Sequence, residues 1–136
     1  GSMGTYEFYD LGDEINAYIN GLGCNTAVGE QIPFGVSARD GAAMHLLYLL
    51  MYLKAVRLEH PSTYQWLKGQ VEWQYAVRYW WARGLYWIGE AQQFPNLGIY
   101  DVPIMTELDD PANHVEIQHF TGQTAEYVEC YPQNGP

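Results

Sequence analysis

The stretch from Trp66 to Trp87, WLKGQVEWQYAVRYWWARGLYW, contains all five tryptophans of this chain of 136 residues. Four of them are seven residues apart: Trp66, Trp73, Trp80 and Trp87. A repeat of seven drifts by only about 20° per heptad on a straight helix, so these side chains predict one apolar ridge on a long helix over residues 63–92. Aromatic stripes at helical spacing are usually core, and we interpret the ridge as a core seam.

The segment before this stretch, residues 38–60, is its expected packing partner. Ser37 is a good N-cap for it, and positions 42–53 are almost wholly apolar. That run is shorter than the roughly 20 residues that span a bilayer, and a helix apolar all round is typical of a buried central helix. Its least apolar stripe holds His45, Tyr48, Tyr52 and Glu59. We expect an antiparallel pair of long helices, with the tryptophans against Leu46, Leu49, Leu50 and Leu53.

The N-terminal part predicts one shorter helix. Asp10 can cap a helix that runs to about Asn20, with apolar residues at helical spacing. The turn-rich segment 23–35, GCNTAVGEQIPFG, has no regular period, so we expect a loop there.

The C-terminal part changes character. Residues 94–113 are interrupted by prolines, which favours a loop or an edge strand. Residues 114–120 and 125–131 alternate with period two around TGQT, as in a β-hairpin. The predicted fold class is therefore α+β: two long antiparallel helices plus a short N-terminal helix, with a C-terminal β-hairpin packed on them.

Charge is segregated along the chain, whose formal net charge is -10. Residues 1–36 carry -5, residues 37–83 carry +3 with all six Lys and Arg, and residues 84–136 carry -8. Such acidity argues against nucleic acid or an anionic membrane as a direct ligand. Two interpretations stay open: the acidic arms fold over the mildly basic centre, or they form an acidic face for a partner.

Three polar side chains follow the edge of the tryptophan face at a spacing of four: Gln70, Gln74 and Arg78. If they are buried, they need hydrogen-bonding partners. A carboxylate of an acidic arm reaching Arg78 would supply one. We favour that salt bridge over a polar-lined pocket for a small ligand beside the aromatic walls.

Twelve tyrosines are a second unusual feature. Tyrosine is enriched at protein interfaces because it offers a large contact area at a low cost in side-chain entropy. The candidate partner-binding residues are three tyrosines on the polar or flanking side of the long helix and three carboxylates of an acidic loop: Tyr75, Tyr79, Tyr86, Glu107, Asp109 and Asp110.

Catalytic motifs are scarce. The chain has no G-x-S-x-G and no Walker A loop, and it has only three serines. A Cys24/His45 pair could act as nucleophile and base. On the predicted hairpin His114 and Glu116 share a face, and Glu129 could join them around a divalent ion. We interpret the first as a chance pair and the second as a solvated face, and we expect no cofactor and no metal ion.

The expected domain organisation is simple. Residues 1–3 resemble a tag scar and a start methionine, residues 4–131 form a single globular domain, and residues 132–136 form a disordered tail. No secretory signal opens the chain, so Cys24 and Cys130 are expected as free thiols in a cytoplasmic protein.

The function that these features favour is a small acidic, non-enzymatic protein-binding module. In character it is an inhibitor of the immunity, antitoxin or anti-CRISPR kind, which docks a basic protein that handles nucleic acid. Two other classes stay open: a small-molecule-binding module with a Trp-lined pocket, and a small enzyme that uses Cys24/His45 or the His114/Glu116/Glu129 group. The wide apolar faces also favour a homodimer through the aromatic helix.

Overall fold

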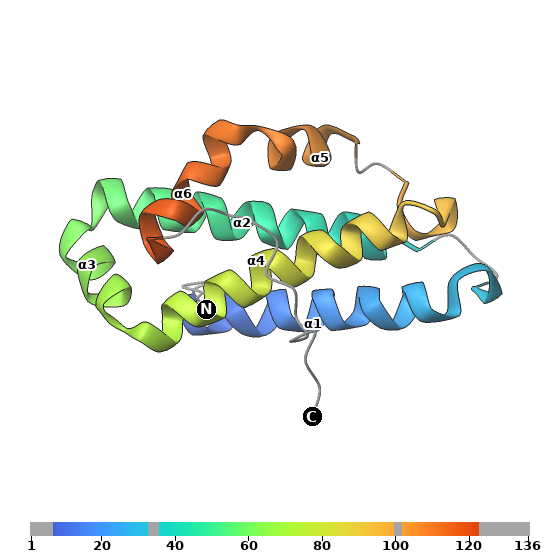
Figure 1. The fold of residues 1–136 in the computed structure, drawn as a ribbon, viewed down its shortest axis with the longest axis horizontal. Helices are drawn as coiled ribbons and strands as arrows, with labels where there is room; N and C mark the ends of the chain where they lie inside the picture. The colour runs from blue at the N-terminus through green and yellow to red at the C-terminus, as the bar shows by residue number, and fades with distance from the viewer. Residues whose placement is uncertain (1–6, 33–35, 100–101, 123–136) are drawn as a thin grey trace, which may run out of the picture.

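The computed structural model describes residues 7–32, 36–99 and 102–122 (Figure 1). Every regular element in these ranges is a helix. In chain order they are α1 (Phe8–Val28), η1 (Gly29–Gln31), α2 (Ala38–Glu59), α3 (Pro61–Gly69), α4 (Val71–Ala91), η2 (Pro95–Leu97), α5 (Val102–Asp109) and α6 (Pro111–Thr121). The predicted α+β class is therefore wrong, because the described chain is an all-α bundle.

Three long helices make up the bundle. α1 and α4 run in the same direction, and α2 runs opposite to both (Figure 1). The short helix α3 turns the chain from the end of α2 into α4. α5 and α6 form an arm that packs along α2, and α6 also contacts α4.

The central helix is α2, which packs against all the other α-helices. Ser37 occupies its N-cap position, as predicted, but the Ser37 side chain makes no capping hydrogen bond. Its core residues are fully buried: Ala42, Ala43, Leu46, Leu49 and Leu53. An 18-residue window of α2 has a mean hydropathy of 1.2, so its length and composition would also allow it to cross a membrane, a criterion that buried core helices can meet as well.

The single helix predicted over residues 63–92 is in fact two helices that meet at Gln70. Gln70 has an extended backbone (φ -90°, ψ 110°) and is the N-cap of α4. The side chain of Gln74 donates to the carbonyl of Lys68 at 2.6 Å, and that of Gln70 donates to the carbonyl of Trp66 at 3.4 Å. These bonds satisfy carbonyls that the end of α3 leaves free. Trp66 is 61% exposed on α3 and does not belong to the ridge.

Trp80 and Trp81 share one buried core with the α2 residues expected beside them: Leu46, Leu49, Leu50 and Leu53. The tryptophans of α4 also make ring contacts with α1 and α6, which the sequence did not predict. The rings of Trp73 and Trp80 lie 4.9 and 6.3 Å from the ring of Phe8 on α1. The ring of Trp81 meets His114 of α6 edge-on at 5.2 Å. Close approach to α1 is possible because glycines face two of the indoles, with Gly12 at Trp80 and Gly23 at Trp87.

The prolines of residues 94–113, which predict a loop or an edge strand from the sequence, start helices in the structure. Pro95, Pro103 and Pro111 each occupy one of the first two positions of η2, α5 and α6. Proline fits there because the first turn of a helix needs no backbone N–H donor. The predicted loop therefore contains α5.

The predicted first strand of the hairpin, residues 114–120, lies within α6. The Asp110 side chain accepts from the backbone N–H of Ala112 at 2.9 Å, and Gly122 ends the helix with φ 71°. Ile117 and Phe120 are both buried, and their spacing of three residues suits a helix. In the sequence this spacing is concealed by the neighbouring residues, which alternate between polar and apolar. The second predicted strand, residues 125–131, lies outside the described residues.

The first helix is longer than the predicted span of residues 10–20. Glu7 is its N-cap, and the Asp10 carboxylate accepts from the backbone N–H of Glu7 at 3.1 Å, which completes a capping box. α1 then continues to Val28, through the first six residues of the loop predicted over residues 23–35. Cys24 is a free, exposed thiol on this helix. Residues 1–3, residues 132–136 and Cys130 lie outside the described residues.

Candidate functional site

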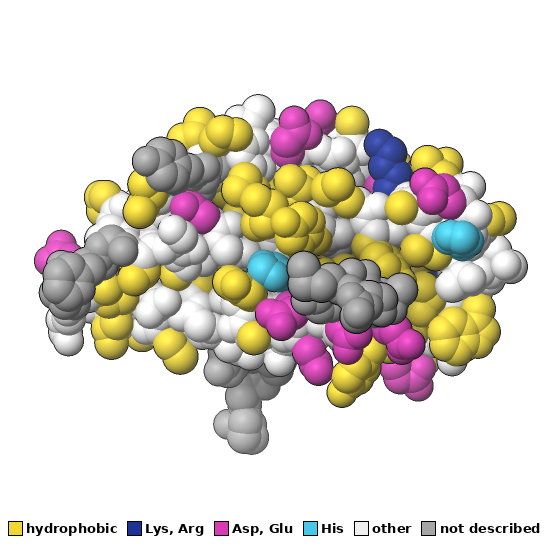
Figure 2. All heavy atoms as spheres, turned by 180° about the vertical axis from the view of Figure 1, so that it is seen from behind, with side chains coloured by type: hydrophobic (Ala, Val, Ile, Leu, Met, Phe, Trp, Pro, Cys, Tyr) yellow, Lys and Arg dark blue, Asp and Glu magenta, His cyan; other side chains and the backbone are white. Residues whose placement is uncertain are grey.

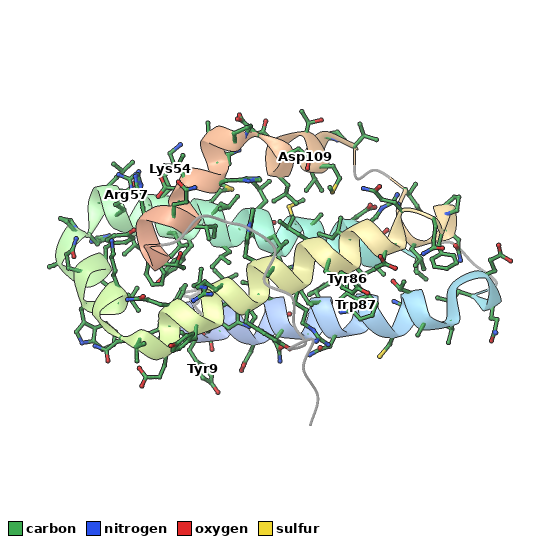
Figure 3. All side chains as sticks on the ribbon, viewed as in Figure 1. Tyr9, Lys54, Arg57, Tyr86, Trp87 and Asp109 are labelled. Atoms are coloured by element: carbon green, nitrogen blue, oxygen red, sulfur yellow. The ribbon has the colours of Figure 1, made fainter. Side chains whose placement is uncertain are left out.

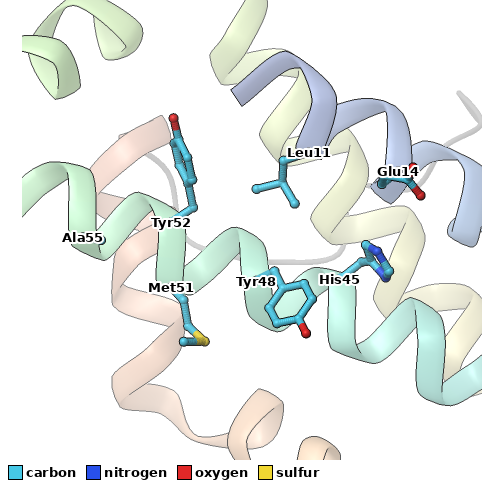
Figure 4. A pocket seen from close by; sticks show the side chains of 7 residues that line it. All are labelled: Leu11, Glu14, His45, Tyr48, Met51, Tyr52 and Ala55. Atoms are coloured by element: carbon cyan, nitrogen blue, oxygen red, sulfur yellow. The ribbon is translucent and has the colours of Figure 1, made fainter. Parts of the chain in front are cut away.

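A groove of about 600 Å³ lies between α1 and α2 (Figure 4). Its walls come from two residues of α1 and five residues of α2: Leu11, Glu14, His45, Tyr48, Met51, Tyr52 and Ala55. In this view α4 lies behind the α1–α2 pair. The groove therefore opens on the side of the bundle away from the exposed surface of α4.

The α1 side of the groove is acidic: Glu14 lines the groove, and Glu7, at the N-cap of α1, is not itself a lining residue. Glu7, Leu11, Glu14 and Tyr18 recur at spacings of four, three and four, which places them on one side of the helix. Both carboxylates are exposed. Burial raises the pKa of Tyr52, and the charge of Glu7 raises it further, so the field of Glu7 reaches into the groove.

The α2 wall is apolar and aromatic. Met51 is 58% exposed, and Tyr48 and Ala55 flank it with exposed side chains. His45 stacks on Tyr18 with ring centroids 3.9 Å apart, and its Nδ1 lies 2.7 Å from the carbonyl oxygen of Gly41. This stack bounds one end of the groove.

At the other end Phe8 stacks on Tyr52 with ring centroids 5.2 Å apart. The two cations of α2 in this region, Lys54 and Arg57, lie beside α6 (Figure 3). Neither cation is among the residues that line the groove. The groove is therefore acidic along α1 and uncharged along α2.

The space-filling view from behind shows the same division (Figure 2). Apolar side chains gather across the middle of this face, and a row of Asp and Glu side chains follows its lower edge, where α1 runs. The exposed carboxylates in the first two turns of α1 and at its N-cap are Glu7, Asp10, Asp13 and Glu14.

The residues predicted to bind a partner fall on two separate surfaces. Glu107 and Asp109 are exposed on α5, and Asp110 is the N-cap of α6. The three tyrosines are exposed on α4: Tyr75, Tyr79 and Tyr86. Figure 3 shows Asp109 on the arm formed by α5 and α6, and Tyr86 on α4.

The structure does not join Cys24 to His45. His45 packs on Tyr18, whereas Cys24 lies six residues further along α1, about 9 Å along the helix axis and on a different side of it. The described contacts of the His45 ring are with Gly41, Tyr18 and Tyr48.

The proposed metal-binding group is likewise dispersed. Two residues apart on a helix means about 200° around its axis, so His114 and Glu116 point in different directions. The Nε2 of His114 bonds the carbonyl of Leu108, and Glu116 forms a two-point salt bridge with Arg57 at 3.0 and 2.5 Å. Glu129 lies outside the described ranges. Within those ranges no cluster of three or more His, Cys, Asp or Glu could hold a metal ion.

The Trp-lined pocket has no counterpart among the three described cavities, since no tryptophan lines any of them. The expected salt bridge between Arg78 and an acidic arm is also not found among the described residues; the carboxylate of Glu116 pairs with Arg57 instead. Hydrogen bonding to Glu116 raises the pKa of Arg57.

One signal in the sequence pointed to the groove. The least apolar stripe of α2 includes three residues that line it: His45, Tyr48 and Tyr52. What the sequence could not provide was the partner of that stripe on α1.

Comparisons with protein-family models, curated proteins and solved structures give no match for this chain.

Proposed function

We propose that this protein is a small acidic binding module that docks a basic surface of another protein and catalyses no reaction. The observation that carries the proposal is the exposure of its carboxylates. Thirteen of the sixteen lie among the described residues, where Asp40 is half-buried, Glu116 is buried and the other eleven are exposed. Exposed carboxylates make the electrostatic potential at the surface negative, and this potential steers a positively charged partner.

Of the two acidic surfaces found among the described residues, the one next to the groove is the better docking site. On α1 the carboxylates adjoin exposed apolar side chains, so one contact can combine charge attraction with apolar burial. Both acidic surfaces include capping carboxylates, with Asp110 on α6 and the Glu7–Asp10 capping box on α1, so the adjoining apolar side chains distinguish them. Glu107 and Asp109 remain candidates for a peripheral electrostatic contact.

Inhibition follows from the kind of partner that suits this surface. Proteins that handle nucleic acid present Lys and Arg clusters to phosphate groups. A protein that covers such a cluster would block access of the nucleic acid. We therefore propose an inhibitor, supported by charge and by exposed apolar area.

The test begins with crosslinking in the native host through a photoreactive residue in place of Ala55, which lines the groove and carries no charge, with one in place of Glu90 on α4 as the control. The recovered protein is then purified, and its association rate with the full chain is measured against ionic strength. We expect the rate to fall as salt rises, because surface charges are screened over about 10 Å at 0.1 M salt. A partner whose rate does not depend on salt would overturn the proposal.

A further inference from the structure

We propose that the occupant of the α1–α2 groove is a single amphipathic helix of the partner, with Lys or Arg along the edge that faces α1. This inference rests on the proposed function and specifies the form of the partner. Its grounds are the length of the groove, the asymmetry of its walls and the charge of the competing occupants.

The length of the groove suits a short helix. Its α2 wall extends from His45 to Ala55, ten residues apart, which corresponds to about 15 Å at 1.5 Å per residue. An occupant helix of about ten residues spans the same length and presents apolar anchors at positions i, i+4 and i+7. The aromatic stacks towards the two ends of the groove, Tyr18 on His45 and Phe8 on Tyr52, limit how far the occupant helix can extend along the groove.

The side chains of the groove suit apolar anchors. Leu11 and Tyr52 lie side by side in Figure 4, and Met51 and Tyr48 project from α2. An exposed methionine is unbranched and polarisable, so it adapts to partner side chains of different shapes. The lining of the groove therefore favours leucine-like or aromatic anchors over polar ones.

The asymmetry of the walls orients the occupant. Glu7 and Glu14 stand one heptad apart on the α1 side, so cations one heptad apart along one edge of the occupant would meet both. The opposite edge would meet Tyr48 and Met51, which carry no charge. An amphipathic helix with a basic edge towards α1 satisfies both walls.

Charge also argues against two occupants from this chain, the segment 123–136 and a second copy. Residues 123–136 contain Glu126 and Glu129 and no Lys or Arg, so they have the same sign as the α1 wall. A second copy of the chain carries a net charge of -10 and is repelled overall. A separate basic partner has neither disadvantage.

The experiment titrates the isotope-labelled full chain with a synthetic 14-residue helical peptide. The peptide has Leu at i, i+4 and i+7 and Lys along one edge; a second peptide has Glu at the Lys positions. We expect the Lys peptide to shift the amide resonances of Leu11, His45 and Met51, and the Glu peptide to bind at least tenfold more weakly. The double substitution Glu7→Gln and Glu14→Gln removes both charges and keeps the side-chain acceptors. It should lower the affinity for the Lys peptide about three- to tenfold.

The matched control removes two charges from the exposed side of α4, with Glu72→Gln and Glu90→Gln, and should leave the affinity unchanged. Equal binding of both peptides, shifts centred on Tyr75 and Tyr79, or no binding of the Lys peptide at millimolar concentration would overturn the inference. So would a contact between residues 123–136 and Met51 in the free chain, or a dimer that Met51→Lys dissociates.

The failure of this inference is distinguishable from the failure of the proposed function. If the association of the native partner depends on salt but its affinity is unchanged by the Glu7 and Glu14 substitutions, the proposed function stands and the groove is not the binding site. If its association is independent of salt, the proposed function itself is wrong.

Discussion

Gly12 of α1 lies so close to the indole of Trp80 on α4 that a Cβ atom at position 12 would come within 2.4 Å of Trp80 Cη2. We therefore expect Gly12→Ala to lower the free energy of unfolding by about 1–3 kcal/mol, because an added methyl group overpacks the helix contact. Gly21 on the same helix has open space around it, so Gly21→Ala should raise stability by about 0.5–1 kcal/mol. Urea denaturation measures both. Equal stability of the Gly12→Ala variant and the parent would disprove the close contact.

The division of the tryptophans between core and surface gives a second prediction. Trp80 is 9% exposed, whereas Trp66 is 61% exposed. Trp80→Ala should lower the free energy of unfolding by about 3–5 kcal/mol, and Trp66→Ala should change it by no more than about 0.5 kcal/mol. Thermal and urea denaturation of the two variants measure the difference. Comparable losses from both variants would show that Trp66 belongs to the core, as in the continuous four-tryptophan ridge predicted from the sequence.

The salt bridge between Arg57 and Glu116 joins α2 to the arm. The Glu116 side chain is 8% exposed and that of Arg57 is 30% exposed, so the pair is partly screened by solvent. Glu116→Gln should lower the free energy of unfolding by about 1–3 kcal/mol, below the roughly 3–5 kcal/mol lost when a fully buried pair is broken. Glu107→Gln on exposed α5 is the control. A double-mutant cycle with Arg57→Ala isolates the coupling, and a coupling near zero would show that the pair contributes nothing.

Alkaline pH should destabilise the fold through Tyr64. Burial, and then the charge of Glu116, raise the pKa of Tyr64 above its ordinary value of 10.0. The folded chain therefore keeps this proton at pH values where the unfolded chain loses it. The corresponding stability is complete below pH 10 and is lost as the pH rises through the raised pKa.

Tyr64→Phe tests this directly. The Tyr64 hydroxyl is buried and has no hydrogen-bond partner among the described residues, so its removal should raise stability at neutral pH by about 1 kcal/mol or less. The variant should also lose less stability than the parent between pH 9 and pH 11. Tyr75→Phe, on the exposed side of α4, is the control, and its profile should follow that of the parent. Parallel alkaline profiles for the parent and Tyr64→Phe would contradict the assignment.

The helices with regular apolar spacing could be predicted from the sequence, and the remaining helices could not. α2 follows from its apolar run and its Ser37 cap. The break at Gln70 is invisible to periodicity, because the pattern of tryptophans continues across it. In the last third, Pro103 and Pro111 stand in first helical turns, where proline is favourable, yet the same residues interrupt strands and helices elsewhere.

Only the α2 side of the candidate site could be predicted from the sequence. His45, Tyr48 and Tyr52 form a visible stripe on α2. Their juxtaposition with Glu7 and Glu14 depends on how α1 packs, which is set by contacts such as that of Gly12 with Trp80. Periodicity along one helix carries no information about which helix lies next to it.

On this proposal, the protein binds its basic partner through the acidic side of the α1–α2 groove. The most direct test is the dissociation constant of the native partner for the parent and for two charge-removed variants. One variant combines Glu7→Gln and Glu14→Gln, and the other combines Glu107→Gln and Asp109→Asn on α5. We predict that the first binds about three- to tenfold more weakly than the parent at 0.1 M salt, and that the second binds within a factor of two of it. Weaker binding by the α5 variant alone would contradict the claim and place the interface on the arm.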